Sequence, residues 1–297
     1  MILSDIVTPP SPEGFGGETV LNASDISVQA DAEKLVASRP DIIFHLAAVV
    51  SGEAEADFEK GYRINLDGGR ILLDAIRQEA MTAGGSYRPR VVFSSSLAVF
   101  GPPFATPIGD EFLTAPETSY GTQKAIVELL LADYSRRGII DGIGLRLPTI
   151  CIRPGKPNAA ASGFFSNILR EPLIGEEAVL PVADSVRHSF ASPRAAVGFM
   201  LHAATVDLSA LGVRRNLIMP GLSATVAEEI EALRAVAGEK AVRLIRREPD
   251  PGIIRIVDGW AYGYAPKTAL SLGFTAEATF AEIINAHIED ELGGRLP

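Results

Sequence analysis

The sequence predicts an α/β fold in which a parallel sheet is covered by helices on both faces. Short apolar runs, such as residues 41–50 and 90–96, alternate with longer segments that carry apolar residues at helical spacing. Strands that alternate with helices indicate βαβ units, and therefore a doubly wound parallel sheet. At 297 residues, with 47% hydrophobic and 22% charged residues, the chain has ample material for such a core.

The first half of the chain supplies the expected elements of this sheet. Their apolar periodicity distinguishes strands, which are short and continuous, from helices, which carry one apolar face. The expected elements are a strand at residues 2–7, a strand within 41–50 that runs into a loop, a helix over 62–81, a strand at 90–96, a helix over 119–137 and a strand at 142–152. Ligands of such sheets bind beyond the carboxyl ends of the strands.

The second half of the chain differs from the first in composition. Residues 153–167 are rich in Pro, Gly, Ala and Asn, and we expect a loop there that is too long for a plain connection and therefore functional. The further expected elements are a loop and helix over 185–206, a strand at 214–221, a helix over 225–238, a strand-like run at 240–250 and a helix over 279–294. Thr225, followed three residues later by Glu228, predicts a capping box.

We expect two units of unequal size. Residues 1–155, joined by 186–220, form a dinucleotide-binding domain of Rossmann type. Residues 156–185 and 221–297 form a smaller lobe that binds the substrate.

Composition excludes several classes of protein. The net charge of −10 argues against a nucleic-acid binder, which would need a basic surface. The single cysteine, Cys151, lies in an apolar run and is expected to be a buried strand residue, so a reducing compartment is the default. No apolar stretch approaches the roughly 18 residues of a membrane span, and the first residues lack the pattern of a signal peptide. We therefore expect a cytoplasmic protein without membrane contact.

The strongest chemical signal is the segment SYGTQK. Tyr120 and Lys124 are four residues apart at the start of a helix, so both side chains lie on one face. A free tyrosine titrates near pH ~10, and a neighbouring ammonium lowers that pKa, which makes the pair a reasonable base for a hydroxyl proton. Ser96 ends a buried strand upstream and can bond the reacting oxygen. Alone, such a pair also fits an ordinary aromatic residue beside a solvated lysine.

In this context the sequence resembles the extended short-chain dehydrogenase/reductase family, which includes nucleotide-sugar epimerases and dehydratases. FSSSLAVFG resembles the strand with the catalytic serine, and SYGTQK resembles the Tyr–Lys pair. HLAAVVSG resembles the loop along the cofactor, NLDGG the helix after it, and RLPTICIRPG the strand that reaches the nicotinamide. The resemblance implies that Ser96, Tyr120 and Lys124 are catalytic, that Lys124 also bonds the nicotinamide ribose, and that the cofactor is NAD. It also implies a homodimer.

The expected cofactor-binding residues come from several segments. Asp5 lies at the end of the first expected strand. An acidic residue there accepts hydrogen bonds from the adenine ribose and would repel the extra phosphate of NADP. ASDIS resembles the segment that meets adenine, although Asp25 also fits a helix N-cap. The complete set of expected cofactor-binding residues is Asp5, Asp25, Ile26, Leu46, Ala47, Ala48, Asn65, Ser94, Tyr120, Lys124, Pro148 and Ile150.

The substrate is expected to be a small molecule. Segments 146–173, 187–196 and 259–274 look like a branch of the family that uses NAD to oxidise a four-carbon sugar acid such as D-erythronate. A sugar acid needs a carboxylate clamp, and Arg187 fits because guanidinium geometry suits carboxylates, although a surface salt bridge is an equal alternative. The expected substrate-binding residues are Ser96, Tyr120, Asn158, Ser162 and Arg187. His188 is expected to be structural, Arg153 and Lys156 to be loop charges, and no metal site is expected.

The glycine-rich phosphate turn of this family is missing. No such turn stands before Asp5, and Gly14 to Thr19 follows a proline loop rather than a strand. Asp5 therefore ends the second strand of the fold, and we expect a sheet that lacks its first strand and helix and binds NAD poorly as it stands. Two other functions stay open: a nucleotide-sugar epimerase or dehydratase, and a non-catalytic NAD-sensing protein.

Overall fold

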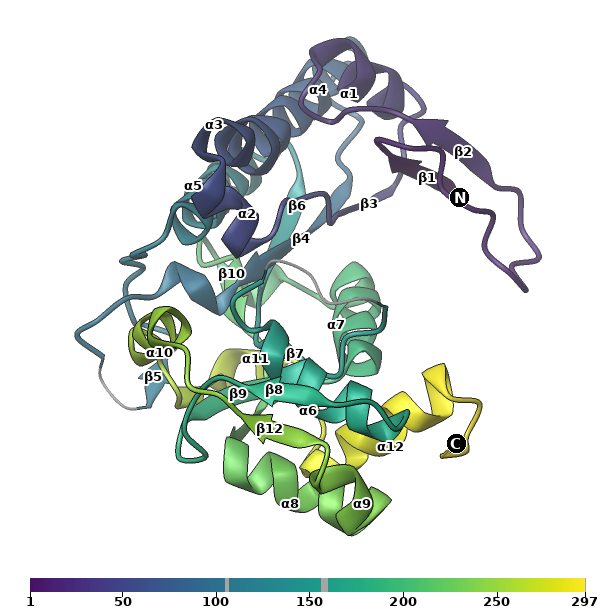
Figure 1. Ribbon diagram of the computed structural model, residues 1–297. Helices are drawn as coiled ribbons and strands as arrows, with labels where there is room; N and C mark the ends of the chain where they lie inside the picture. Colours follow the sequence, from purple (N-terminus) through teal and green to yellow (C-terminus); the bar gives the residue numbers. More distant parts are fainter. Residues whose placement is uncertain (105–106, 156–159, 297) are drawn as a thin grey trace.

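The computed structural model describes residues 1–104, 107–155 and 160–296, and its centre is a four-stranded parallel sheet (Figure 1). The strands are ordered β10 (Asn216–Ile218), β6 (Asp141–Leu147), β4 (Arg90–Ser96) and β3 (Ile42–His45). All three pairings are parallel, so the carboxyl ends of β4 and β6 lie side by side, with Ser96 opposite Leu147. The α/β fold class is therefore confirmed.

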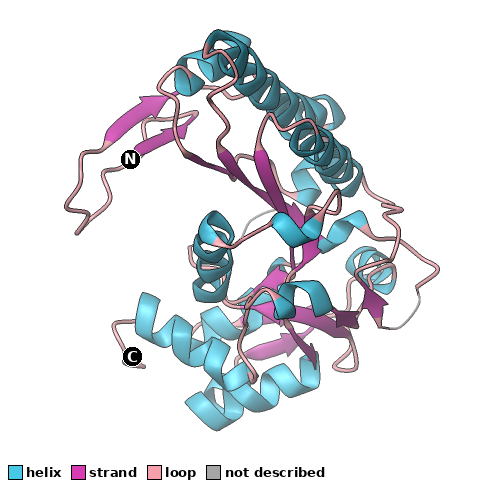
Figure 2. Cartoon of the chain, turned by 180° about the vertical axis from the view of Figure 1, so that it is seen from behind, coloured by secondary structure: helices cyan, strands magenta, loops and turns pink. Residues whose placement is uncertain are grey.

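Alternation along β4 shows why helices cover both faces of the sheet. Val91 and Phe93 pack in one cluster with α4 (Gly68–Thr82) and α5 (Ser119–Arg136), whereas Val92 between them packs in another. Successive strand residues point to opposite faces, so one strand serves two cores. The second cluster includes Phe199 and Ala203 of α7 (Pro193–Thr205). Figure 2 shows the central strands with helices on either side.

The first two strands form a separate parallel sheet. β1 (Ile2–Asp5) pairs with β2 (Val20–Ala23), and α1 (Gln29–Val36), which follows them, packs in one cluster with α4. Within the described residues, β1 has no partner but β2, and β3 has no partner but β4. Figure 1 shows the β1–β2 unit standing apart from β3. This break agrees with the prediction of a sheet that lacks its first strand.

Exposed apolar side chains mark the same break. On β3 and just after it, Ile42, Phe44 and Leu46 are 41%, 40% and 54% exposed, although a central strand of a doubly wound sheet is normally buried. On β1, Ile2 is 38% exposed. The edges that flank the break are therefore apolar as well as unpaired among the described residues.

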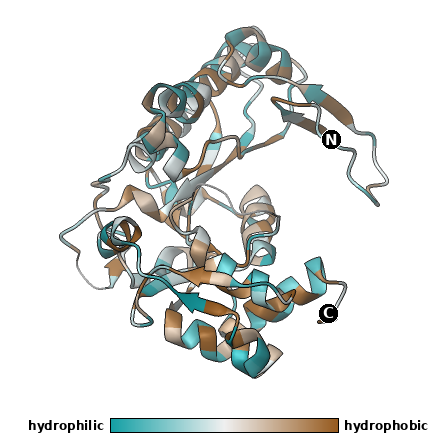
Figure 3. Cartoon of the chain, in the orientation of Figure 1, coloured by the Kyte–Doolittle hydropathy of each residue, from teal (hydrophilic) through white to brown (hydrophobic). Residues whose placement is uncertain are grey.

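The C-terminal part builds its own core. Its largest cluster joins Cys151 and Ile152 to α6 (Gly163–Leu173), α8 (Val226–Ala237) and α12 (Phe280–Glu291). Figure 3 shows hydrophobic and hydrophilic stretches alternating along α8 and α12, as expected for amphipathic helices. Both of these helices begin with a capping box, at Thr225–Glu228 and Thr279–Glu282, and the first confirms the sequence prediction.

Shorter elements complete the chain. A three-stranded sheet contains β7 (Thr149–Ile150), β9 (Arg187–Ala191) and β11 (Leu222–Thr225), and two-stranded sheets pair β8 (Ala178–Leu180) with β12 (Ile245–Arg247) and β5 (Ile108–Gly109) with β13 (Tyr264–Ala265). The remaining elements are α2 (Ser51–Ala56), α3 (Phe58–Gly61), η1 (Tyr62–Asp67), η2 (Leu97–Val99), η3 (Ser209–Leu211), α9 (Glu239–Val242), α10 (Pro251–Asp258) and α11 (Lys267–Ser271). No described helix combines the length and the apolar character that crossing a bilayer would require.

Several sequence predictions need correction. The strand expected at 142–152 is two strands, because Pro148 cannot donate to a ladder and β7 continues in another sheet. The loop expected at 153–167 contains the start of α6 at Gly163. The strand-like run at 240–250 begins with α9 before β12, and the loop expected before α7 contains β9. The helix expected at 62–81 begins as the π-helical segment η1.

Candidate active site

The candidate active site lies where the carboxyl end of β4 meets the first turn of α5. Ser94 and Ser96 end the strand, and Tyr120 follows the first residue of the helix. The N-cap Thr118 fixes that start, because its hydroxyl accepts a hydrogen bond from the backbone N–H of Gly121 at 3.0 Å. The structure therefore brings Ser96, which precedes residue 100, together with Tyr120 and Lys124 of the following helix.

Gly121 explains how closely the helix approaches the strand. A Cβ atom at this position would lie 2.1 Å from the carbonyl oxygen of Ala98, which belongs to the turn directly after Ser96. Only a residue without a side chain tolerates this contact. Tyr120 is held against Ser96 by this direct approach of one backbone to the other.

Lys124 lies one turn further along the helix and is only 2% exposed. Its ammonium Nζ donates a hydrogen bond to the carbonyl oxygen of Ser94 at 2.8 Å and lies 5.6 Å from the centre of the Tyr120 ring. Burial lowers the pKa of Lys124 to about 8, and the charge of Glu128 opposes that shift. Lys124 therefore joins the end of β4 to the face of the tyrosine.

The environment of Tyr120 shows which groups act on its phenol. Burial raises the pKa of Tyr120 to about 12, while the hydrogen bond with Ser96 and the positive charge of Arg153 both act to lower it. The ammonium of Lys124 lies 5.6 Å from the centre of the ring, and its role as the partner that lowers the pKa of Tyr120 stays a prediction. Lys124 also anchors the end of β4 through Ser94.

A buried ion pair links α5, which carries Tyr120 and Lys124, to the central strands. Glu128 follows Lys124 by one turn of α5 and accepts hydrogen bonds from Arg146 on β6 and, at 2.6 Å, from the hydroxyl of Ser95 on β4. The carboxylate and guanidinium form two parallel contacts of 2.9 and 2.7 Å. One acidic side chain therefore ties the helix to both central strands. The sequence analysis did not single out either Glu128 or Arg146.

The predicted ribose and adenine residues lie at the end of the β1–β2 unit. Asp5 ends β1, and its carboxylate accepts only from the neighbouring N–H of Ile6 among the described residues. Asp25 accepts from Ser27 and pairs with Arg63 at 3.2 Å; the hydrogen bond from Ser27 is the main lowering influence on its pKa. The N-cap of α1 is Val28, so Asp25 is not the cap. Ile26 packs against the hydrophobic cluster that joins Val91 and Phe93 to α4 and α5, and it faces Gly68.

The other predicted cofactor residues divide into open and buried groups. Leu46, Ala47 and Ala48 are exposed after β3, and Ser94 is partly exposed. Asn65 is buried and uses its amide to bond Val49 and Gln123, so it shapes the loop after β3. Pro148 is buried, and Ile150 packs against the hydrophobic cluster that contains Val92 and Phe199.

The predicted residues include contacts for the ribose groups of a dinucleotide but not for its pyrophosphate. Asp5 has no cation in ion-pair contact among the described residues, which leaves its carboxylate available to ribose hydroxyls. Lys124 and Ser94, which the sequence predicted to contact the cofactor, meet at the carboxyl end of the central sheet. A glycine-rich turn for the pyrophosphate is not found after β1 or β3 in the part of the chain that the structure describes.

The predicted substrate residues behave differently from one another. Asn158 and Lys156 lie outside the described residues. Ser162 accepts a hydrogen bond at 3.0 Å from Arg153, whose charge acts on Tyr120. Arg187 is exposed and pairs with Glu228 at 3.2 Å, as in the alternative of a surface salt bridge. His188 is buried against Phe165 and Trp260 and contacts Thr149 at 2.7 Å.

Arg153 was expected to be a loop charge, and it does lie in the loop after β7. It is also partly buried, and its charge acts on the phenol of Tyr120. The available signal was its position directly after the apolar run that ends at Ile152. A polar residue at the carboxyl end of a sheet strand is a candidate ligand contact.

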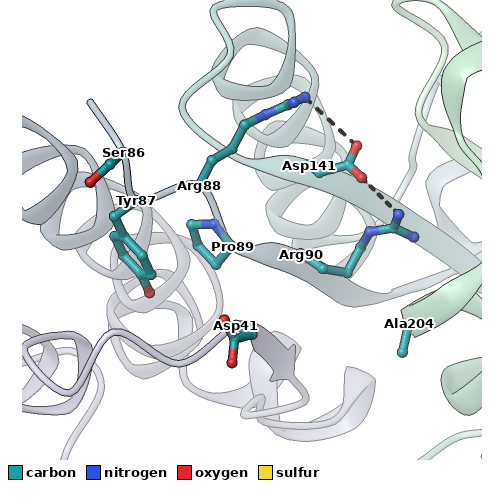
Figure 4. A pocket seen from close by; sticks show the side chains of 8 residues that line it. All are labelled: Asp41, Ser86, Tyr87, Arg88, Pro89, Arg90, Asp141 and Ala204. Atoms are coloured by element: carbon teal, nitrogen blue, oxygen red, sulfur yellow. Dashed lines mark ion pairs between the residues drawn. The ribbon is translucent and has the colours of Figure 1, made fainter. Parts of the chain in front are cut away.

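A surface pocket at the opposite end of the sheet has no link to this chemistry. Figure 4 shows that it is lined by residues at the amino ends of the strands, with Arg88 and Arg90 both turned toward Asp141. Both cations pair with the one carboxylate of Asp141, and Arg90 also donates to the carbonyl oxygens of Ala203 and Val206. Within the described ranges no cluster of His, Cys, Asp and Glu is arranged to hold a metal ion.

Comparison with known proteins adds the relatives of this chain. Residues 8–205 match the NAD dependent epimerase/dehydratase family. D-erythronate dehydrogenases from Cupriavidus necator and Haemophilus influenzae are 44% and 39% identical over 98% of this chain, and the matches cover 87% and 90% of those proteins. The crystal structure of a nucleoside-diphosphate-sugar epimerase from Agrobacterium tumefaciens is 67% identical, with a TM-score of 0.96 over all of this chain and 86% of that one.

A more distant structure extends the likeness to the fold alone. L-threonine 3-dehydrogenase from Trypanosoma brucei is 20% identical with a TM-score of 0.84 over 97% of this chain and 87% of that one. The family match spans the strand with Ser96 and the helix with Tyr120 and Lys124. From this match and the two full-length relatives, the chain belongs to the NAD-dependent epimerase/dehydratase family.

Proposed function

We propose that this protein oxidises a hydroxyl group of a small sugar acid such as D-erythronate, with NAD as the oxidant. The observation that carries the proposal is the convergence of Ser96, Tyr120 and Lys124 at the carboxyl end of β4. The two relatives named D-erythronate dehydrogenase support the choice of substrate, since both match this chain along almost its whole length.

Each of the three residues has a separate role in the proposed reaction. Ser96 donates a hydrogen bond to the substrate oxygen and stabilises its developing charge. Tyr120, as phenolate, accepts the hydroxyl proton while the C–H bond breaks, which converts the alcohol next to the carboxylate to a ketone. Bound NAD supplies the acceptor for the two electrons and the hydrogen that leave as hydride. Lys124 fixes the end of β4 through Ser94, and its ammonium would bond the nicotinamide ribose of bound NAD.

The positive charges suit an anionic substrate. Lys124 lies 5.6 Å from the centre of the Tyr120 ring and the charge of Arg153 acts on its phenol, while the buried acid Glu128 is already paired with Arg146. A negatively charged substrate is therefore attracted to the side of the site where the proton is removed. This local sign is opposite to the overall charge of −10.

We further propose a domain organisation, a cellular location and an oligomeric state for this protein. Residues 156–185 and 221–297 serve as the substrate-binding lobe, which is supported by the separate core around α6, α8 and α12. The protein is a cytoplasmic homodimer. Leu129 on α5 and Met81 on α4 are each 70% exposed, which supports an interface on these two helices.

A second candidate function comes from the Agrobacterium relative. Its printed name is nucleoside-diphosphate-sugar epimerase, and it is more similar to this chain than the two dehydrogenases are. An epimerase would use the same tyrosine but would regenerate its cofactor within each cycle. It would therefore produce no net NADH.

The test measures net reduction of NAD. We expect absorbance at the wavelength of NADH to rise with D-erythronate and NAD, and to stay flat with UDP-glucose. Turnover of UDP-glucose without NADH would support the epimerase instead. Calorimetric titration with NAD in the same samples separates a chain that cannot bind the cofactor from one that rejects the substrate.

A further inference from the structure

We propose that Arg153 binds the carboxylate of the substrate and thereby sets the preference of this enzyme for sugar acids. This inference rests on the proposed function and assigns a residue to its substrate specificity. It moves the carboxylate clamp from Arg187, where the sequence placed it, to the loop that follows β7.

The first argument is the missing counter-charge. Among the residues that the structure describes, only Lys124 and Arg153 are cationic, not exposed and without a carboxylate within ion-pair distance. The other unpaired cations are all exposed, namely Lys34, Arg137, Lys240, Arg243, Arg255, Lys267 and Arg295. A guanidinium that is partly removed from water normally has an anionic partner. In a chain with 37 acidic residues, the absence of one at Arg153 indicates a place reserved for an anion that the protein does not supply.

The second argument is location. Arg153 directly follows Ile152, whose side chain is fully buried, and its charge lowers the pKa of Tyr120. The chain reaches Arg153 shortly after Leu147, which lies opposite Ser96 at the carboxyl end of the central sheet. An anion bound to Arg153 is therefore placed at the end of the sheet that carries Ser96 and Tyr120.

The third argument is preorganisation. The backbone of Arg153 is held at both of its polar atoms, because its N–H donates to Ser166 at 3.1 Å and its carbonyl oxygen accepts from Arg170 at 2.7 Å. Its side chain donates from Nη2 to Ser162 at 3.0 Å. That contact uses one of five N–H donors, so the remaining donors can bond a carboxylate in a bidentate manner. Ser162 acts as a positioning residue for the guanidinium.

Arg187 provides the contrast. Its guanidinium is exposed, pairs with Glu228 and donates to the carbonyl oxygen of Ser223 at 3.1 Å. Glu228 is itself committed to the capping box of α8. A substrate carboxylate would have to compete with an existing acid at Arg187, whereas at Arg153 it has no competitor among the described residues.

The experiment compares Arg153→Gln, Arg153→Lys and the control Arg187→Gln. Because Ser166 and Arg170 contact only the backbone of residue 153, we expect all three variants to fold, with circular dichroism as the check. For D-erythronate, kcat/KM should fall about 100-fold in Arg153→Gln, mainly through KM, and recover partly in Arg153→Lys. Arg187→Gln should stay within about 3-fold of wild type.

A neutral probe separates carboxylate binding from a general defect. D-erythronolactone keeps the four carbons but has no carboxylate, and its kcat/KM should be the same in wild type and Arg153→Gln. The affinity for NAD should also be unchanged. Equal losses on acid and lactone, or an equal loss in Arg187→Gln, would overturn the assignment.

A thermal shift assay keeps this inference distinct from the proposed function. If the wild type fails to reduce NAD with D-erythronate, the proposed function fails, but binding of the acid can still be measured. Stabilisation of the wild type and not of Arg153→Gln by millimolar D-erythronate would support Arg153. Stabilisation of both to the same extent, or of neither, would refute it.

Discussion

Arg146 and Glu128 form a bidentate ion pair between β6 and α5, with nitrogen–oxygen distances of 2.9 and 2.7 Å. Both side chains are nearly inaccessible to water, and Ser95 completes the set by donating to the same carboxylate at 2.6 Å. Arg146 also stacks on Phe100, with 4.9 Å between the guanidinium carbon and the ring centre. The pair therefore fixes the distance between the helix with the catalytic residues and the sheet.

Removal of one partner of this pair should be costly. Glu128→Gln leaves a buried guanidinium without its counter-charge, and we expect unfolding free energy to fall by about 3–5 kcal/mol. The double variant Glu128→Leu/Arg146→Met removes both charges and should recover most of that loss. Urea unfolding of the three proteins measures both effects. A loss below about 1 kcal/mol in the single variant would contradict the role given to the pair.

Tyr120→Phe should abolish most of the chemistry and little else. The hydroxyl is the proposed proton acceptor, so kcat should fall by about 10²–10⁴-fold. Calorimetric affinity for NAD and the melting temperature should remain close to wild type. Tyr134→Phe is the matched control and should retain activity, because Tyr134 lies on the same helix but packs against the hydrophobic cluster with α4. Survival of activity in Tyr120→Phe would show that another group is the base.

Gly121→Ala tests the close approach of α5 to the turn after Ser96. The new methyl group would lie 2.1 Å from the Ala98 carbonyl oxygen, so the helix must move away from the strand. A displacement of this kind can cost about 100-fold in rate, and we expect kcat/KM to fall accordingly.

Gly198→Ala is the control for this substitution. Gly198 lies inside α7, where an added Cβ meets no atom within 4 Å. Alanine there should stabilise the protein by about 0.5–1 kcal/mol because it favours the helix. If both glycine variants behaved alike, helix propensity rather than the close contact would explain the result.

His45 should make the protein sensitive to acid. Burial lowers the pKa of His45 from 6.5 to about 3, and the nearby charge of Lys124 acts in the same direction. The unfolded chain binds the proton first, so the stability that His45 contributes is complete above pH 6.5 and is lost as the pH falls toward 3. We expect a loss of about 2 kcal/mol at pH 5 from this residue.

The comparison is with His45→Leu, which cannot titrate. The ring nitrogen Nε2 of His45 is buried and has no hydrogen-bond partner among the residues that the structure describes, so an apolar side chain suits the position. Chemical unfolding at pH 7.5 and pH 5 should show a smaller difference for the variant than for the wild type. Equal differences would assign the acid sensitivity to other groups, such as His188, whose pKa burial lowers to about 4.

The sequence was most informative where local pattern and function coincide. The strand at 90–96 and the helix that begins at Ser119 were predicted closely, because an apolar run and an N-capped amphipathic segment are local signals. The separate β1–β2 unit was also consistent with the absence of a glycine-rich turn. These elements carry Ser94, Ser96, Tyr120 and Lys124, so most of the proposed chemistry followed from them.

Burial and charge pairing were beyond the sequence. Arg153 and Arg187 are both arginines beside apolar runs, and only the tertiary structure shows that Glu228 neutralises one of them. The influence of Arg153 on Tyr120, and the distance between Lys124 and Ser94, depend on side-chain directions that spacing does not encode. The start of α6 was missed because the glycine at its first residue is typical of a loop.

The two halves of the proposed site belong to different hydrophobic cores. Arg153 follows residues of the core around α6, α8 and α12, whereas the helix of Tyr120 packs in the core between α4 and the central sheet. A substrate that touches both side chains would be a non-covalent cross-link between two hydrophobic cores of the molecule. Its binding energy would therefore add to the stability of the folded protein as well as to specificity. Gly121 contributes to this link because it lets the helix of Tyr120 lie directly against the turn after Ser96.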